Sequence, residues 1–187
     1  MTDKSRSKDK GQKNKMVKAL FPGTFDPIHY GHIDIASRAS RMFDEVVMAV
    51  YDKPLKSLLF APEERMELVR EAFKSNPKIK VTGYSGLTVE FARQINAQVI
   101  VRGLRVFSDF EFEFRMGLAN QRLASDIETV AFITAEEHTF LSSSTVKEIA
   151  SLGGDVSSMV PAHVDAALKK KVLNLGDGHA VPNALRD

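Results

Sequence analysis

The sequence predicts an α/β protein with a doubly wound, five-stranded parallel sheet and helices on both faces. Five short apolar runs alternate with amphipathic segments, in the order β-α-β-α-β-α-β-α-β-α. Hydrophobic residues make up 43% of the 187 residues, which is enough to build a core. No linker, composition break or internal repeat divides the alternation. These observations together indicate one Rossmann-like domain over residues 16–172.

The five apolar runs are each short enough to be a single buried strand. They cover residues 17–21, 46–51, 79–82, 98–101 and 129–133. Strands that alternate with helices pair in parallel, because each helix returns the chain to the start of the sheet. We therefore expect the carboxyl ends of all five strands to meet at one edge.

Helical periodicity is clearest after the first two strands. The apolar stripe after the first strand is Ile33, Ala36, Ala39 and Phe43, and the stripe after the second is Met66, Leu68, Val69 and Phe73. Pro62 fits the first turn of the second of these helices, where an amide hydrogen is not needed. Glu63 and Glu64 suit the positive end of the same helix.

Two further helices complete the predicted fold. Ser108 and Glu111 have capping-box spacing and would begin a helix that runs to about residue 125. A last helix is expected over residues 161–172. We expect residues 1–15, which carry much of the basic excess, to be a disordered tail, and residues 173–187 to be a loose carboxyl-terminal tail.

Composition excludes several classes of function. The chain has no cysteine, so disulfides, thiolate metal sites and a thiol nucleophile are excluded. Its formal charge of +2, from 26 basic and 24 acidic residues, gives no case for a nucleic-acid partner. No apolar run approaches the roughly 20 residues that cross a bilayer, and the amino terminus lacks the apolar core of a secretion signal. We expect a soluble, cytoplasmic protein with no membrane partner.

Polar residues gather where the predicted strands end. The clusters are residues 23–32 (GTFDPIHYGH), residues 102–105 (RGLR) and residues 141–144 (LSSS), and Lys56 follows the second strand. In an open parallel sheet, ligands bind beyond the carboxyl ends of the strands. This edge is therefore the predicted functional site.

The stretch GTFDPIHYGH is suited to holding an anion at a helix start. Gly31 lets a bulky group approach the first helical amides, whose dipole favours negative charge. His32 would face that anion from the first turn, and Thr24 adds a hydroxyl. Two alternatives are open. His29 and His32 could share a metal ion, although no third ligand or H-E-x-x-H pattern supports one, or both could cap local backbone groups.

The other clusters add cations and hydroxyls. Arg102 and Arg105 could grip phosphate through paired N–H groups, or could pair with Glu111 or Glu113 in a surface network. The serine run could bind phosphate with helix amides, or could only cap the helix that follows.

No obvious nucleophile accompanies these groups, and Glu113 is the nearest acid. Positioning and charge stabilisation dominate transfer at a phosphorus centre, and the clusters suit that chemistry. Neither a G-x-G-x-x-G after a strand nor a P-loop pattern is present, so hydride transfer and P-loop hydrolysis lose support.

Several motifs resemble those of a known family. GTFDPIHYGH resembles the (H/T)-x-G-H signature of the nucleotidylyltransferase superfamily. The segments FAPEER, RGLRVFSDFEFE and FLSSSTVKE follow in the order and at the spacing of bacterial phosphopantetheine adenylyltransferases. The resemblance runs from about Val17 to Lys171. It departs at Phe112, where tyrosine is frequent, and at His138, where an aromatic residue is common.

The resemblance implies an enzyme of coenzyme A synthesis. It would join ATP and 4'-phosphopantetheine to give dephospho-coenzyme A and pyrophosphate, with Mg²⁺ as cofactor. The acceptor phosphate would attack the α-phosphorus in line, without a covalent intermediate. Since members are usually hexamers, a homohexamer is also implied.

The resemblance further implies roles for individual residues. His32 and Lys56 would be catalytic and would stabilise charge on the α-phosphate. The acceptor would contact Thr24, Lys56, Leu87, Thr88, Arg102 and Asn120, with Arg102 on its phosphate. ATP would contact Thr24, Phe25, His32, Gly103, Leu104, Arg105, Glu113, His138, Thr139, Phe140, Leu141, Ser142, Ser143 and Ser144. The ligands of the metal are left unassigned.

Two rival functions share these features. An enzyme that adenylates nicotinamide mononucleotide would use the same scaffold, although the RGLR cluster argues against it. A nucleotide sensor without turnover could keep the phosphate grip, although the pair of His32 and Lys56 argues against that.

Overall fold

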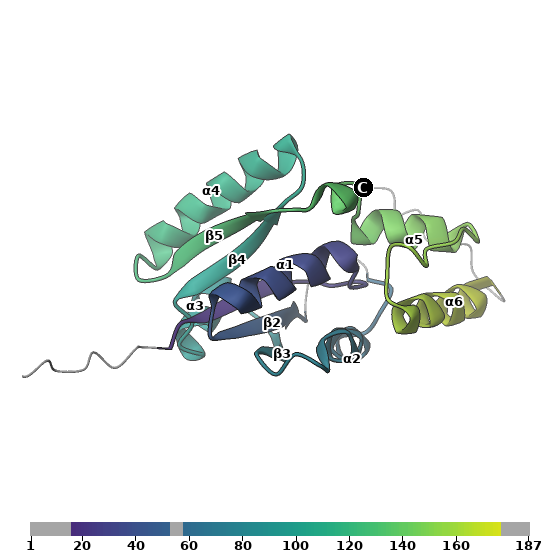
Figure 1. The fold of residues 1–187 in the computed structure, drawn as a ribbon, viewed down its shortest axis with the longest axis horizontal. Helices are drawn as coiled ribbons and strands as arrows, with labels where there is room; N and C mark the ends of the chain where they lie inside the picture. Colours follow the sequence, from purple (N-terminus) through teal and green to yellow (C-terminus); the bar gives the residue numbers. More distant parts are fainter. Residues whose placement is uncertain (1–15, 53–57, 177–187) are drawn as a thin grey trace, which may run out of the picture.

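A computed structural model describes residues 16–52 and 58–176 and has an all-parallel, five-stranded sheet at its centre. The strand order is β3-β2-β1-β4-β5 (Figure 1). The strands are β1 (Lys18–Gly23), β2 (Glu45–Tyr51), β3 (Ile79–Tyr84), β4 (Val99–Leu104) and β5 (Glu128–Ile133). The predicted α/β class, parallel pairing and strand positions are confirmed.

Six α-helices connect and follow these strands in the described part of the chain. They are α1 (Tyr30–Met42), α2 (Pro62–Phe73), α3 (Thr88–Gln94), α4 (Phe107–Leu123), α5 (Ser143–Ser151) and α6 (Ala162–Gly176). A short 3-10 turn (Glu136–His138) precedes α5. Figure 1 shows α5 and α6 side by side, and the two helices are in contact.

Two hydrophobic layers cover the two faces of the sheet. Ala19 and Phe21 of β1 belong to one layer, together with buried residues of α1, α2, α5 and α6. Leu20, between them, belongs to the other layer, with α3 residues such as Ala92. Successive side chains of a strand point to opposite faces, so a continuous apolar run such as that of β1 fills both layers.

The sheet opens at the carboxyl end of β1. Strand β1 continues past the predicted end at residue 21, and Pro22 and Gly23 pair with Ala49 and Val50 of β2. On the other side, β1 pairs with β4 only at Ala19 and Leu20. Proline has no amide hydrogen, so the pairing of β1 with β4 can end near this point while the pairing with β2 continues. The chain also reverses its direction of strand addition between β1 and β4, which makes this opening the topological switch point.

Two predicted helix ends differ from the structure. Helix α4 begins at Phe107 with Val106 as N-cap, so Ser108 is not the capping residue that its spacing suggested. The carboxylate of Asp109 accepts the amide of Arg105, the residue that precedes this N-cap. Helix α6 runs to Gly176, which makes residues 173–176 helical rather than part of a loose tail. The tails predicted at residues 1–15 and 177–187 lie outside the described residues.

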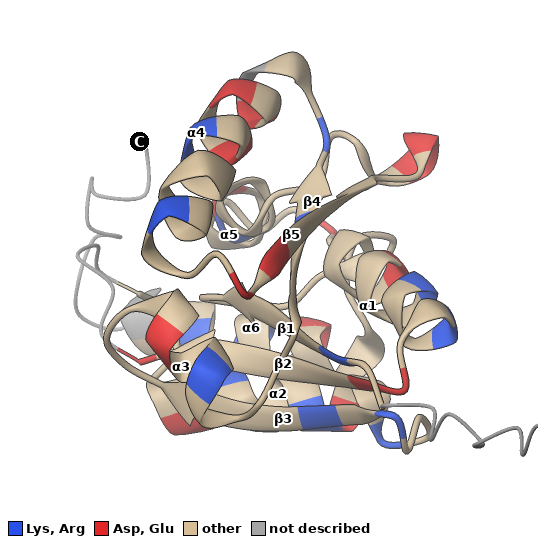
Figure 2. Ribbon diagram, turned by 90° about the vertical axis from the view of Figure 1, so that its left-hand side faces the viewer, with Lys and Arg blue, Asp and Glu red and all other residues tan. Residues whose placement is uncertain are grey.

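Charged residues of both signs occur along the helices. On α4 the acidic positions (Asp109, Glu111 and Glu113) come first and the basic positions (Arg115 and Arg122) follow (Figure 2). Among the helices that the structure describes, none is both long enough and apolar enough to span a bilayer.

Candidate active site

A cavity of about 770 Å³ lies at the opening between β1 and β4. Its walls come from the ends of these two strands, the starts of α1, α3 and α5, and one side of α4. The three polar clusters that the sequence placed at one sheet edge therefore meet around one cavity.

Two histidines stack at the start of α1. His29 is the N-cap, and its backbone N–H donates to Nδ1 of His32 at 3.3 Å. The two rings lie 3.7 Å apart between centroids and are nearly parallel, and the rings of Phe21 and Phe25 meet His32 edge-on. The backbone-capping alternative is thus correct for His32. Gly31 leaves room for the His29 ring, because a Cβ there would lie 3.1 Å from that ring, which is a tight contact.

The stacked rings are not arranged to share a metal ion. Nitrogen lone pairs lie in the plane of an imidazole, so two nearly parallel rings direct them along separate lines. In residues 16–52 and 58–176, no group of three or more His, Asp or Glu side chains could hold a metal ion.

His32 is a neutral donor rather than a cation. Burial lowers its pKa from 6.5 to about 3, and the charges of Arg105 and Arg102 act in the same direction. The pKa of His29 is also well below the ordinary value. Burial is the main cause, and the neighbouring His32 lowers it further. Because Nδ1 of His32 accepts a backbone hydrogen, the single proton of the neutral ring lies on Nε2. The ring therefore offers an N–H donor on a wall of the cavity.

We expect His32 to stay neutral, in the Nε2–H form, from pH 8 down to pH 5. Nitrogen-15 NMR of histidine-labelled protein measures this, with the His32→Gln variant providing the assignment. The unfolded chain takes up this proton near pH 6.5 and the folded chain only near pH 3, so this histidine makes folding less stable as pH falls below 6.5. A resonance of His32 that titrates between pH 6 and 7 would contradict the assignment.

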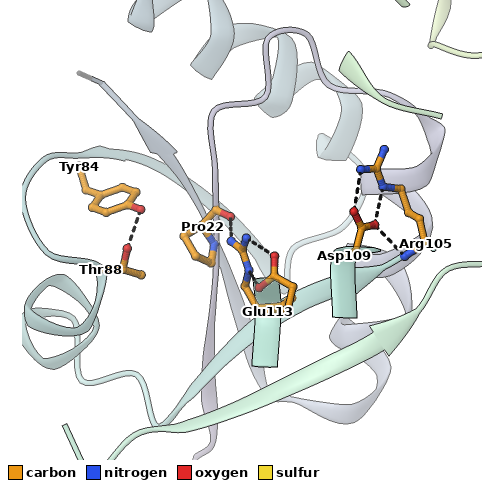
Figure 3. Close-up of polar contacts among 7 residues, drawn as sticks. Pro22, Tyr84, Thr88, Arg105, Asp109 and Glu113 are labelled. Atoms are coloured by element: carbon orange, nitrogen blue, oxygen red, sulfur yellow. Dashed lines mark hydrogen bonds and ion pairs between the residues drawn. The ribbon is translucent and has the colours of Figure 1, made fainter. Parts of the chain in front are cut away.

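Arg102 is held in place by a carboxylate on α4. Its Nε and Nη2 donate to the two carboxylate oxygens of Glu113 at 2.7 and 2.6 Å, and Nη1 donates to the Pro22 carbonyl (Figure 3). These bonds use three of the five N–H groups of a guanidinium. Of the two pairings that the sequence left open, the one with Glu113 occurs, and two N–H groups remain for a ligand.

Arg105 has a different partner from those the sequence suggested. Its guanidinium pairs with Asp109, in the first turn of α4 (Figure 3). Nη1 of Arg105 also donates to the Leu141 carbonyl at 2.7 Å. The side chain thereby links the start of α4 to the serine run. Asp109 was missed, although an Arg and an Asp four residues apart at a helix start are a recognisable signal.

The serine run forms the start of α5. Ser142 is the N-cap, and its Oγ accepts the Thr145 amide at 3.0 Å. Ser143 Oγ donates to the Pro27 carbonyl, which ties α5 to the loop after β1. All three serines line the cavity. Capping and ligand contact, which the sequence treated as alternatives, are therefore compatible.

Most of the predicted site residues line the cavity. Those that do are Thr24, Phe25, His32, Leu87, Thr88, Arg102, Gly103, Arg105, Glu113, Asn120, Ser142, Ser143 and Ser144. Those that do not are Leu104, His138, Thr139, Phe140 and Leu141. Leu141 is buried, and Phe140 is exposed on the surface. Lys56 lies outside the described residues.

Three buried charged residues behind the cavity were not identified from the sequence. Asp26 and Lys147 form an ion pair of 2.8 Å, and Arg65 donates to the backbone carbonyls of Thr24 and Tyr51 in the cavity wall. The motifs GTFDPIHYGH, FAPEER and FLSSSTVKE contain one of these residues each. Their burial depends on tertiary packing, which no single motif shows.

The fold and the cavity define a class, the nucleotidyltransferases. Residues 20–149 match the model of the Cytidylyltransferase-like family. A crystal structure of a Vibrio parahaemolyticus protein, assigned as a nicotinate-nucleotide adenylyltransferase, has the same fold, with a TM-score of 0.64 and 19% identity over 83% of this chain and 99% of that chain.

Curated relatives narrow the class. A phosphopantetheine adenylyltransferase of Roseiflexus sp. (strain RS-1) is 56% identical over 155 residues, which is 83% of this chain and 97% of the relative. An enzyme of the same name from Desulfitobacterium hafniense (strain Y51) is 50% identical over 82% of this chain and 94% of the relative. Another from Methylococcus capsulatus (strain Bath) is 50% identical over 86% of this chain and 99% of the relative. The chain belongs to the phosphopantetheine adenylyltransferase family.

Proposed function

We propose that this chain transfers AMP from ATP to 4'-phosphopantetheine, giving dephospho-coenzyme A and pyrophosphate. The observation that carries the proposal is the convergence of a neutral histidine donor, two arginines and a serine-capped helix start on one cavity at the switch point. The similarity to enzymes that bear the name phosphopantetheine adenylyltransferase supports the choice of acceptor.

The transfer needs positioned donors more than a protein nucleophile. The acceptor phosphate oxygen forms a bond to the α-phosphorus as the bond to the bridging oxygen of pyrophosphate breaks. His32 Nε2–H donates to the α-phosphate as charge develops on it, and the start of α5 receives the leaving pyrophosphate. Removing one such donor typically raises the barrier by about 2.7–4 kcal/mol.

The lining of the cavity also fits the proposed acceptor. Arg102 is placed to hold its phosphate, while Leu87, Thr88 and Asn120 line the continuation towards α3 and α4. Met116 and Leu123 add apolar surface there. A pantetheine arm, which is mostly uncharged, would lie along this wall.

We propose that Mg²⁺ enters with the nucleotide. The two carboxylates that line the cavity, Asp109 and Glu113, already pair with arginines, so the described residues do not fit a protein cage for the ion. Mg²⁺ often keeps several waters and is held by substrate phosphates.

Discrimination between acceptors tests the proposed function. Purified protein with ATP and Mg²⁺ receives either 4'-phosphopantetheine or nicotinamide mononucleotide, and products are identified by mass. The proposal expects dephospho-coenzyme A with equimolar pyrophosphate, and little turnover of the mononucleotide. Preference for the mononucleotide would replace the proposed function with the rival one.

Arg102→Ala is expected to weaken 4'-phosphopantetheine binding by about 10- to 100-fold, because a hydrogen bond to a charged group is worth about 1.5–3 kcal/mol. ATP binding should change less. Calorimetry with each ligand measures both affinities, and Arg122→Ala, at an exposed position of α4, is the control. Equal losses for both ligands would contradict this division of labour.

We also propose that the chain assembles into a homohexamer through α4. Phe107, Phe110 and Phe114 are 88, 50 and 55% exposed and stack in sequence along this helix, and Ile133 of β5 is 75% exposed. Unpartnered apolar surface of this kind marks protein interfaces, and the family resemblance supports a second copy of this chain as its partner.

Phe114→Glu is expected to convert the assembly into smaller species, since a buried, unpaired carboxylate opposes association. Light scattering coupled to size exclusion measures the mass, which for wild type should be six times the chain mass of 20.7 kDa. Met42→Glu, at an exposed apolar position of α1, is the control. A monomeric wild type would overturn the assembly proposal.

A further inference from the structure

We propose that Arg65 is a positioning residue for the transfer, although it lies behind the cavity and does not line it. Its guanidinium would fix the peptide between Thr24 and Phe25 so that the Phe25 amide is presented to a phosphate of the substrate. The inference rests on the proposed function and adds a residue that acts through the backbone.

Arg65 binds the backbone at the position where the pairing between β1 and β2 ends. The last backbone pair is Gly23 with Val50. At the next position, Nη1 of Arg65 donates to the carbonyls of both Thr24 and Tyr51, each at 2.7 Å. Nε of the same side chain donates to the Phe60 carbonyl at 3.2 Å. One cation thus joins three backbone segments, two of which belong to residues that line the cavity.

The side chain is fully buried, with 0% exposure. Burial lowers the pKa of Arg65, while the carboxylates of Asp26 and Asp52 act to raise it. A buried guanidinium is costly to desolvate, so the hydrogen bonds that it does make are strongly directed. Nε and Nη1 of Arg65 donate to backbone carbonyls, while Nη2 is buried without a partner among the described residues. The carbonyls that accept from Nη1 are thereby fixed in direction.

The direction of the Thr24 carbonyl sets the direction of the next amide. In a planar trans peptide, C=O and N–H point to opposite sides. Since the Thr24 oxygen points at Arg65, the Phe25 N–H points away from it. Phe25 has a left-handed backbone, with φ of 49°, which an ordinary residue adopts only when its surroundings enforce it.

The same loop is held from its other side. Asp26 is 1% exposed and accepts the amides of Leu59 and Phe60 and the ammonium of Lys147. With Asp26 anchored, the Thr24–Phe25 peptide is the adjoining unit whose orientation depends on Arg65. Loss of the guanidinium therefore releases this peptide while the Asp26 contacts remain.

The variants Arg65→Lys and Arg65→Ala test this role. Lysine keeps the charge but cannot span three carbonyls with a planar fork. We expect Arg65→Lys to remain folded by circular dichroism. Its kcat should fall roughly 10- to 100-fold while the KM for ATP changes far less, because displacing a catalytic group by about 1 Å can lower the rate about 100-fold. Arg70→Ala, at an exposed arginine of the same helix, should keep wild-type kcat.

Chemical rescue separates positioning from folding. Low, non-denaturing guanidinium chloride should restore part of the kcat of Arg65→Ala, and equal sodium chloride should not. The proposal is overturned if Arg65→Lys keeps kcat within twofold of wild type. It is also overturned if the loss of kcat in both variants is fully explained by the fraction of protein that is folded. The same conclusion applies if neither variant folds. Failure of wild type to make dephospho-coenzyme A would instead refute the proposed function.

Discussion

Replacing His32 with alanine is expected to lower kcat by roughly 100-fold or more while the protein remains folded. The alanine variant loses the Nε2–H donor on the cavity wall, and loss of one preorganised donor costs about 100- to 1000-fold in kcat. The ring is neutral already, with a pKa of about 3, so the loss is that of a hydrogen bond and not of a positive charge. Steady-state release of pyrophosphate measures the effect.

A matched pair of amides separates the two functions of His32. The side-chain oxygen of asparagine can take the place of Nδ1, which accepts the His29 amide. The terminal nitrogen of glutamine can instead take the place of Nε2. We expect His32→Asn to be as impaired as alanine, and His32→Gln to retain more activity. Near-normal turnover of His32→Ala, or better activity of the asparagine variant, would refute the donor assignment.

The second large effect is expected on stability. Lys147 and Asp26 are 6 and 1% exposed and form a buried ion pair. Lys147→Met removes one charge and leaves the other buried, which typically costs 3–5 kcal/mol. Two backbone amides still bond to Asp26, so the lower end of that range, about 3 kcal/mol, is expected here.

Urea unfolding measures this loss of free energy. The control is Lys169→Met, which breaks the pair of Lys169 with Asp165 on the surface of α6. The lysine of that pair is 65% exposed, and such pairs contribute between about 0 and 1 kcal/mol. A change below 1 kcal/mol for Lys147→Met would show that the pair does not hold the loop to α5.

The sheet could be predicted because its strands are continuous apolar runs buried on both faces. The run of β1 shows this, with Ala19 and Phe21 in one layer and Leu20 in the other. Strand ends were harder to predict, because they depend on pairing rather than on hydrophobicity. Pro22 was expected to lie beyond β1, yet it pairs with Ala49 because β2 continues beside it.

The location of the site followed from topology, while its internal partners did not. The rule that ligands bind at the carboxyl ends of strands placed Arg102, His32 and the serine run together, and they do line one cavity. The sequence could not show that His32 is neutral, because its pKa depends on burial. Nor could it show Arg65 among backbone carbonyls, since those contacts join residues up to 41 positions apart.

The stereochemical course at the α-phosphorus tests the central claim most directly, namely that positioned donors transfer AMP without a protein nucleophile. The Sp isomer of adenosine 5'-O-(1-thiotriphosphate) and 4'-phosphopantetheine give a chiral thio-analogue of dephospho-coenzyme A, whose isomers phosphorus-31 NMR distinguishes by comparison with synthetic standards. A single in-line displacement predicts inversion of configuration. Retention would indicate two displacements through a covalent intermediate on the protein, and would contradict the account.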